Sequence, residues 1–232
     1  MKIISVTKEK ILIGLYLLVI LIGLAFTLRN ETVLTSTVSM PLSKKIILID
    51  AGHGGYDPGK VSGSTQEKTI NLAIALRLQN YLEQADATVL MTRVDDSDLA
   101  NSKKSDMYSR KLTADTSNAD IFVSIHQNSY PGSSVQGAQV FYFNHSDNSK
   151  RLAVCIQNEL KSFIGNNNKR EVSENSSYYV LKKTSMPAVI VECGFLTNPG
   201  EKSKLSDPDY QDRIAWAVYM GIVDYFRDNG QK

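Results

Sequence analysis

Three short apolar runs, rich in β-branched residues, set the strongest limit on the fold of this chain. They are Ile46–Ile49, Ile121–Ile125 and Ala188–Val191. A short and nearly continuous apolar run, without polar alternation, is typical of a strand that is covered on both faces. Such strands occur in parallel sheets that lie between layers of helices. The runs therefore predict an α/β domain with a buried sheet.

Helical patterns occupy the segments between these runs. Within residues 67–83, Ile70, Ile74, Leu78 and Leu82 recur at intervals of four and form one apolar stripe. Further helices are expected at 105–116, 148–163 and 209–227, and further strands at 88–92, 139–143 and 178–181. This alternation predicts a single layered domain with a mostly parallel, twisted sheet that is flanked by helices.

An apolar segment without charged residues, 11–28, precedes the domain. Its length is at the lower limit for a transmembrane helix and exceeds that of a usual signal-peptide core. Lysines before it predict that the N-terminus stays in the cytoplasm and the domain is exported. We expect a membrane anchor or signal segment at 1–29, a linker at 30–44 and the globular domain at 45–232. An uncleaved anchor is favoured over a removed signal, and a buried helix of the domain is the third alternative.

The charge balance gives no support for a nucleic-acid partner. The formal net charge is +2, and residues 1–29 contribute four basic side chains and one acidic side chain, so the remainder is close to −1. A domain of this charge is not expected to bind a polyanion. Cys155 and Cys193 are too few for a disulfide framework and lack the spacing of a zinc knuckle. They are either two small buried side chains or, in an oxidising compartment, a single bridge.

Potential metal ligands follow the predicted strands. His53 follows the first apolar run, His126 the run at 121–125, and Glu192 the run at 188–191. In open sheets of this class the working site lies beyond the carboxyl ends of the strands. A catalytic zinc often has two histidines and one carboxylate as ligands and keeps a position for water. Glu67, which opens a predicted helix, is the candidate third ligand, whereas His145 lies in a polar stretch and is expected to be exposed.

Each of these residues also has a simpler interpretation. His53 fits a glycine-rich turn without any ligand, and His126 fits a hydrogen-bonded histidine of the core. Ser64 and Glu67 form the pattern of a capping box, which explains Glu67 as well as metal binding does. Glu192 is either a surface carboxylate in an ion pair or a general base at an apolar wall. In the second case desolvation would raise its pKa and a nearby cation would lower it.

Five segments, in the same order along the chain, resemble the family 3 N-acetylmuramoyl-L-alanine amidases. They are Ile49-Asp-Ala-Gly-His-Gly-Gly, Glu67-Lys with Asn71-Leu-Ala, Thr92-Arg, Val123-Ser-Ile-His-Gln-Asn, and Pro187-Ala-Val-Ile-Val-Glu-Cys-Gly-Phe-Leu-Thr-Asn. The resemblance implies that His53, Glu67 and His126 bind Zn²⁺ and that Glu192 is the catalytic glutamate. It also implies cleavage of the amide between the lactyl group of N-acetylmuramic acid and L-alanine, with Asn128 orienting substrate or a ligand.

The short architecture resembles the germination-specific amidases of spore-forming bacteria. These enzymes trim the peptidoglycan of the spore cortex so that muramic-δ-lactam can form. The resemblance implies a peptidoglycan substrate, an extracytoplasmic location such as the forespore envelope, and membrane contact through the N-terminal segment. Residues 127–191 are already assigned to other elements and leave no obvious room for a helix that plugs the site. Control by expression, by location or by an accessory activator protein is therefore expected instead. The alternatives are a zinc peptidase acting on the stem peptide and a noncatalytic wall-binding module.

Overall fold

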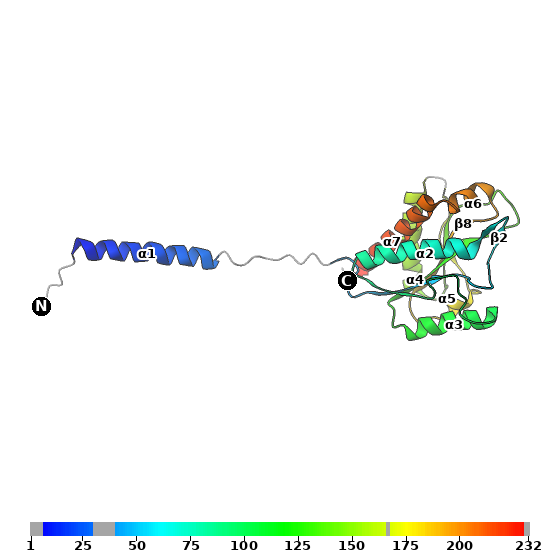
Figure 1. Cartoon of the computed structure of the whole chain (residues 1–232), viewed down its shortest axis with the longest axis horizontal. Coiled ribbons are helices and arrows are strands. Elements are labelled where there is room, and N and C mark those ends of the chain that lie inside the picture. Colours follow the sequence, from blue (N-terminus) through cyan, green and yellow to red (C-terminus); the bar gives the residue numbers. More distant parts are fainter. Residues whose placement is uncertain (1–6, 30–39, 166–167, 230–232) are drawn as a thin grey trace. The chain divides into compact units, whose positions relative to one another are not determined.

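The computed structural model describes residues 7–29, 40–165 and 168–229, and the chain divides between Ser39 and Met40 into two units. In the first unit, helix α1 (Lys8–Arg29) covers the predicted apolar segment (Figure 1). Its large apolar side chains from Ile11 to Leu24 are exposed. Within these described ranges, no helix has both the length and the hydropathy needed to cross a membrane. Residues 1–6 of the predicted anchor or signal segment and residues 30–39 of the predicted linker lie outside the described residues.

The second unit is built on a six-stranded sheet with the order β4-β1-β5-β8-β6-β7. Strands β4, β1, β5 and β8 are parallel, β6 is antiparallel to β8, and β7 is parallel to β6. The strands are β1 (Ile46–Ala51), β4 (Thr88–Met91), β5 (Ile121–Asn128), β6 (Gln139–Tyr142), β7 (Ser173–Glu174) and β8 (Ala188–Phe195). The prediction of a mostly parallel sheet is confirmed. A separate hairpin of β2 (Val61–Ser62) and β3 (Thr65–Gln66) precedes the first helix of this unit.

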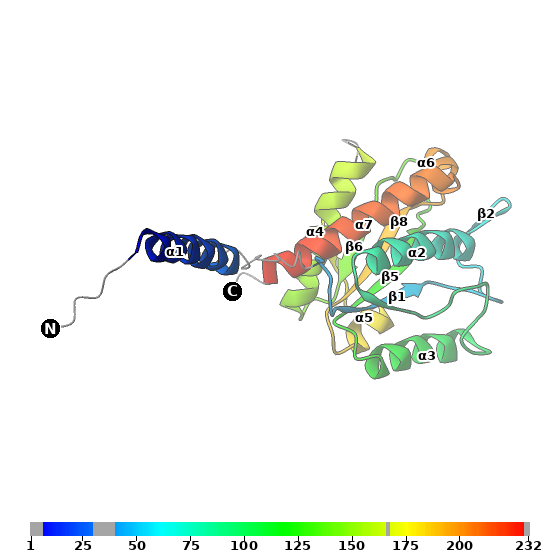
Figure 2. The same ribbon diagram turned by 60° about the vertical axis from the view of Figure 1, so that its left-hand side comes forward.

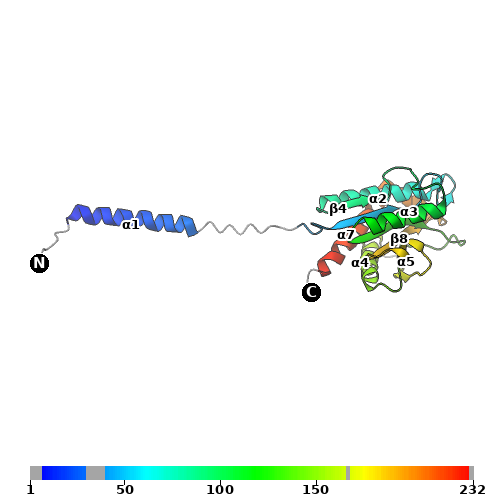
Figure 3. The ribbon, with the colours of Figure 1, turned by 90° about the horizontal axis from the view of Figure 1, so that it is seen from below.

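Helices cover both faces of the sheet (Figures 2 and 3). Helices α2 (Glu67–Gln84), α4 (Asp147–Ile164) and α7 (Pro208–Asn229) pack on one face over the larger apolar core. Helices α3 (Lys103–Thr116) and α5 (Tyr179–Lys183) lie side by side on the other face over a smaller core, and α6 (Pro199–Leu205) follows β8. Leu42 is fully buried in the larger core, so residues before Lys45 already pack on the domain.

The predicted strand at 178–181 is wrong, because residues 179–183 form the short helix α5. The segment Tyr178-Tyr-Val-Leu has high β-propensity, but Leu181 is buried in the smaller core together with Phe122, and this packing decides the local structure.

Strands β5 and β8 extend beyond their apolar runs, so His126 and Glu192 lie within strands rather than after them. Cys193 is buried, Cys155 is half-buried, and no disulfide joins them.

Candidate metal centre

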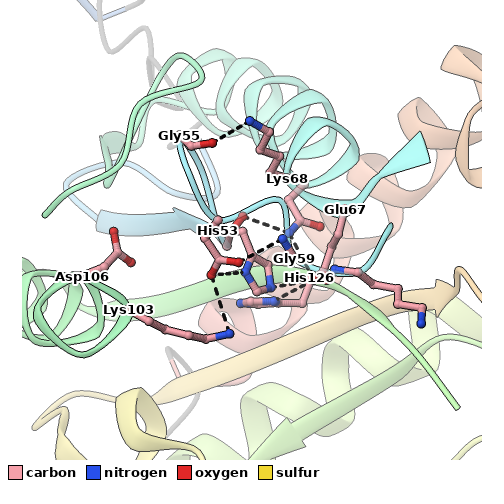
Figure 4. Close-up of polar contacts among 12 residues, drawn as sticks. His53, Gly55, Gly59, Glu67, Lys68, Lys103, Asp106 and His126 are labelled. Carbon is pink, nitrogen blue, oxygen red and sulfur yellow. Dashed lines mark hydrogen bonds and ion pairs between the residues drawn. The ribbon is translucent and has the colours of Figure 1, made fainter. Parts of the chain in front are cut away.

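His53, Glu67 and His126 come together at the carboxyl ends of β1 and β5 (Figure 4). One ligand atom of each side chain lies within 4.8 Å of those of the other two. Glu67 Oε1 is 3.2 Å from His53 Nε2 and 3.0 Å from His126 Nδ1, and the two imidazole rings meet edge to face with centroids 5.0 Å apart. The three residues that the sequence nominated as metal ligands are therefore neighbours in the fold.

Two glycines allow the three side chains to approach so closely. A Cβ atom on Gly52 would lie 2.3 Å from atoms of the His126 ring, so a residue with a side chain does not fit between β1 and β5 at this point. Gly59 has a φ of 65°, and a Cβ atom there would lie 2.6 Å from Glu67 Oε2 and from His53 Cδ2. Glycine is thus required at Gly52 by close packing and at Gly59 by both packing and backbone conformation.

The Glu67 carboxylate is buried and is held in one orientation by backbone amides. Lys60 N donates to Oε2 over 2.8 Å, and Gln127 N donates to Oε1 over 3.0 Å. Burial alone would raise the pKa of Glu67, but its contacts with His126 and His53 hold that pKa well below its ordinary value. The predicted capping box is not formed, because α2 begins at Glu67 with Gln66 as its N-cap and without a side-chain cap. Glu67 faces the two histidines and is ionised.

The second nitrogen of His53 is held by Asp57, whose Oδ2 lies 2.8 Å from Nδ1. A carboxylate in this position selects the tautomer that leaves Nε2 free to bind a metal. Burial would raise the pKa of Asp57, but the contact with His53 and the amide of Gly59 lower it. The ammonium group of Lys103 on α3 lies 3.8 Å from the same carboxylate oxygen and extends toward the histidines (Figure 4).

Glu192 lies beside this cluster, because it is the register partner of His126 on the neighbouring strand β8. Its side chain is buried, and burial raises its pKa to about 7, with Glu67 adding to the effect and the two histidines opposing it. Oε2 has no hydrogen-bond partner, and Tyr178 Oη lies 3.5 Å from Oε1. Burial and the charge of Glu192 raise the pKa of Tyr178 to about 12, so its hydroxyl is protonated and can donate. The interpretation of Glu192 as a surface carboxylate is wrong.

A cavity of about 140 Å³ is lined by His53, His126, Tyr178 and Glu192 among others. It lies between the end of the sheet and helices α3 and α5, and both acidic and apolar side chains line it. The lining residues are Asp50, His53, Asp57, Lys103, Asp106, Met107, Arg110, Ser124, His126, Tyr178, Tyr179, Val180, Ile190 and Glu192. A substrate group in this cavity would contact the histidines and Glu192 at the same time.

The donor set fits a catalytic zinc ion. Two imidazole nitrogens and one carboxylate oxygen converge, which is a common ligand set of hydrolytic zinc sites that keep a position for water. A buried carboxylate oxygen without a partner at Glu192 is expected where a reacting group binds. The side chain of Asp57 supplies the outer contact that metal-binding histidines usually have.

Sequence reasoning missed three residues of this region. Asp57 lies four residues after His53, and its role becomes visible only when the glycine-rich turn folds. The pattern around Tyr178 predicts a strand, and Arg110 lies on a predicted helix whose sequence gives no sign of a functional role. His145 is exposed, as expected, and packs on Phe143. Asn128 accepts a hydrogen bond from Ser129 N and does not line the cavity, so its suggested contact with substrate stays a prediction.

Known proteins resemble this chain both in sequence and in fold. The family described as N-acetylmuramoyl-L-alanine amidase matches residues 47–224. The germination-specific N-acetylmuramoyl-L-alanine amidase of Bacillus subtilis is 38% identical over 200 residues, which cover 83% of this chain and 84% of the relative.

Two solved structures superpose on most of the chain. The CwlD amidase from Clostridioides difficile, in complex with the GerS lipoprotein, gives a TM-score of 0.76 at 43% identity over 79% of this chain and 99% of that one. An N-acetylmuramoyl-L-alanine amidase from Clostridium difficile 630 gives a TM-score of 0.73 at 35% identity over 80% and 98%. At 43% and 35% identity, both proteins resemble this chain in sequence as well as in fold.

Proposed function

Because the chain belongs to the N-acetylmuramoyl-L-alanine amidase family, and therefore acts on cell-wall peptidoglycan, we propose that it does so as a zinc enzyme. His53, Glu67 and His126 would hold one Zn²⁺, and Glu192 would be the catalytic glutamate. The bond cleaved is the amide between the lactyl group of N-acetylmuramic acid and L-alanine. The observation that carries this proposal is the convergence of the three ligand atoms within 4.8 Å beside a buried, unpartnered carboxylate oxygen.

Bound zinc would polarise the lactyl carbonyl and make the attacking water more acidic. The protein's own part is proton transfer and orientation. Glu192, whose pKa is raised by burial, accepts a proton from the attacking water at Oε2 and returns it to the leaving nitrogen of L-alanine. Tyr178 donates toward Oε1 and thereby keeps Oε2 directed at the cavity. Asp57 fixes the ring of His53 throughout.

Digestion of purified peptidoglycan by the zinc-loaded chain tests this function. We expect new amino groups on L-alanine only, which chemical labelling followed by hydrolysis and amino-acid analysis identifies. New amino groups on later residues of the stem peptide would instead identify a zinc peptidase. Binding to peptidoglycan without any new amino group would identify a noncatalytic wall-binding module. The Glu192→Gln variant is the matched blank, because it keeps the fold and the ligands.

We also propose a role on the spore cortex, supported by the germination-specific relative. The test is expression of this chain in a Bacillus subtilis strain that lacks that relative. Return of muramic-δ-lactam to the cortex supports the role. A cortex without the lactam, from cells that contain the active enzyme, contradicts it.

Two further proposals concern location and partners. The peptidoglycan substrate supports action outside the cytoplasm, and export through residues 1–29 would provide it. Membrane fractionation of the chain with and without these residues tests the anchor.

The lipoprotein bound to the CwlD amidase supports an accessory protein for this chain as well. Purified chain that reaches full activity without any added protein would exclude an obligatory activator.

A further inference from the structure

Two buried arginines, Arg93 and Arg110, donate hydrogen bonds to the backbone carbonyl groups around His53. Arg93 Nε donates to the carbonyl of Ala51 over 2.8 Å, and Arg93 Nη2 donates to that of Gly52 over 3.1 Å. Arg110 Nη1 donates to the carbonyl of Ala51 over 3.0 Å, and Arg110 Nη2 donates to that of His53 over 2.8 Å. Three successive carbonyl groups, ending at a candidate metal ligand, are thus fixed by guanidinium groups.

This turn has an unfavourable backbone conformation. His53 has a φ of 62°, and Gly54 and Gly55 follow with φ of 139° and 52°. A residue with a side chain rarely adopts a positive φ, and it does so only where its surroundings hold it there. Without the arginine contacts, His53 would be expected to relax toward a negative φ and to move its imidazole away from Glu67.

Arg110 is itself fixed by two carboxylates. It forms ion pairs with Asp50 on β1 and with Asp106 one turn earlier on α3. Burial would lower the pKa of Arg110, but these two partners raise it above its ordinary value, so the guanidinium is always charged. Arg110 therefore connects the His53 turn rigidly to β1 and to helix α3.

We propose that Arg110 and Arg93 are positioning residues that hold the His53 turn in its metal-binding conformation before any metal is bound. We refer to this pair as the arginine clamp. The inference rests on the proposed function for the identity of the ion at His53, but the clamp itself belongs to the metal-free protein. Its effect is on metal affinity, because a turn that is already ordered loses less conformational freedom on binding.

The test uses the full chain with Arg110→Met and Arg110→Lys, and Arg213→Met as control. Arg213 also donates to a backbone carbonyl, that of Phe163, but on helix α7 away from the turn. The first readout is amide hydrogen exchange in the metal-free proteins at Gly54 and Gly55. These amides donate to Asp57 O and to Asp96 Oδ1, so their exchange reports opening of the turn.

We expect exchange at these two amides to be at least about 10-fold faster in Arg110→Met, with core amides of β5 unchanged. The second readout is the zinc dissociation constant from competition with a chromogenic chelator. It should weaken about 10- to 100-fold in Arg110→Met, as for other residues that orient metal ligands. Arg110→Lys keeps the charge but not the two-pronged contact, so it should show an intermediate effect on both readouts, and Arg213→Met should show none.

Several results would overturn the clamp. Wild-type exchange at Gly54 and Gly55 in Arg110→Met is one, and an equal acceleration at β5 amides, which means general destabilisation, is another. If Arg110→Met does not fold, Arg110→Lys decides, and wild-type values for both readouts reject the proposal. If the wild-type chain binds no zinc, the proposed function fails, whereas the exchange measurement still decides the clamp.

Discussion

His126 and Glu192 lie opposite each other on the neighbouring parallel strands β5 and β8. This register places a candidate metal ligand and a candidate proton carrier side by side on two central strands of the sheet. Precise geometry is easier to maintain on central strands than on loops. The loop-borne ligand His53 needs additional support, which Asp57 and the arginine clamp provide.

Replacement of Glu192 by Gln should abolish turnover while leaving metal binding intact. The amide keeps the size of the side chain but cannot carry a proton, and general acid–base catalysis contributes about 10²- to 10⁴-fold to rate. We expect kcat to fall by at least about 10²-fold, the lower end of this range. The zinc content should equal that of the wild type. Assay of peptidoglycan hydrolysis, together with metal analysis, checks both statements. Substantial turnover in this variant would remove Glu192 from the mechanism.

Replacement of Asp57 by Asn should weaken metal binding. The neutral amide gives His53 a poorer hydrogen-bond acceptor, and loss of such a partner typically costs about 10- to 100-fold in metal affinity. Chelator competition measures the change. Asp98→Asn, which removes an exposed carboxylate of a nearby loop, is the control and should behave as the wild type. Equal affinities of the two variants would show that Asp57 does not orient His53.

Stability toward acid should depend on Asp50. Burial would raise the pKa of this carboxyl group, but Arg110, Ser124 and Thr92 bring it down to about 2, below the ordinary value of 3.8. The stabilisation is therefore complete above about pH 4 to 5 and is lost as the pH falls through 4 toward 2. A shift of this size corresponds to about 2 kcal/mol in the free energy of unfolding. Denaturant unfolding between pH 2 and pH 6 should show a shallower decline for Asp50→Asn, and an identical decline would contradict this assignment.

The sequence predicts the frame of this site better than its details. The apolar runs identify β1, β5 and β8, and their ends carry His53, His126 and Glu192 because parallel strands bring their carboxyl ends together. The local pattern is not sufficient for Glu67, because it fits both a capping box and a metal ligand. The two interpretations are distinguished only by the contacts of Glu67 with His53 and His126 in the folded domain. The contact between Arg110 and His53 joins residues far apart in the chain, and no periodicity indicates it.

The short helix α5 shows the same limit from the opposite direction. Its residues favour a strand by propensity, yet tertiary packing of Leu181 makes them helical. This helix and Tyr178 at its N-cap form one wall of the cavity. The part of the site that sequence reasoning missed is therefore the part that tertiary contacts determine.

The central claim is tested most directly by the zinc content of the purified, folded chain and of two histidine variants. The account predicts one zinc ion per wild-type chain and one per His145→Ala chain, because His145 is exposed. It predicts a large loss in His126→Ala, where only two protein ligands remain. A metal-free wild-type protein at saturating zinc, or a full zinc content in His126→Ala, would contradict it.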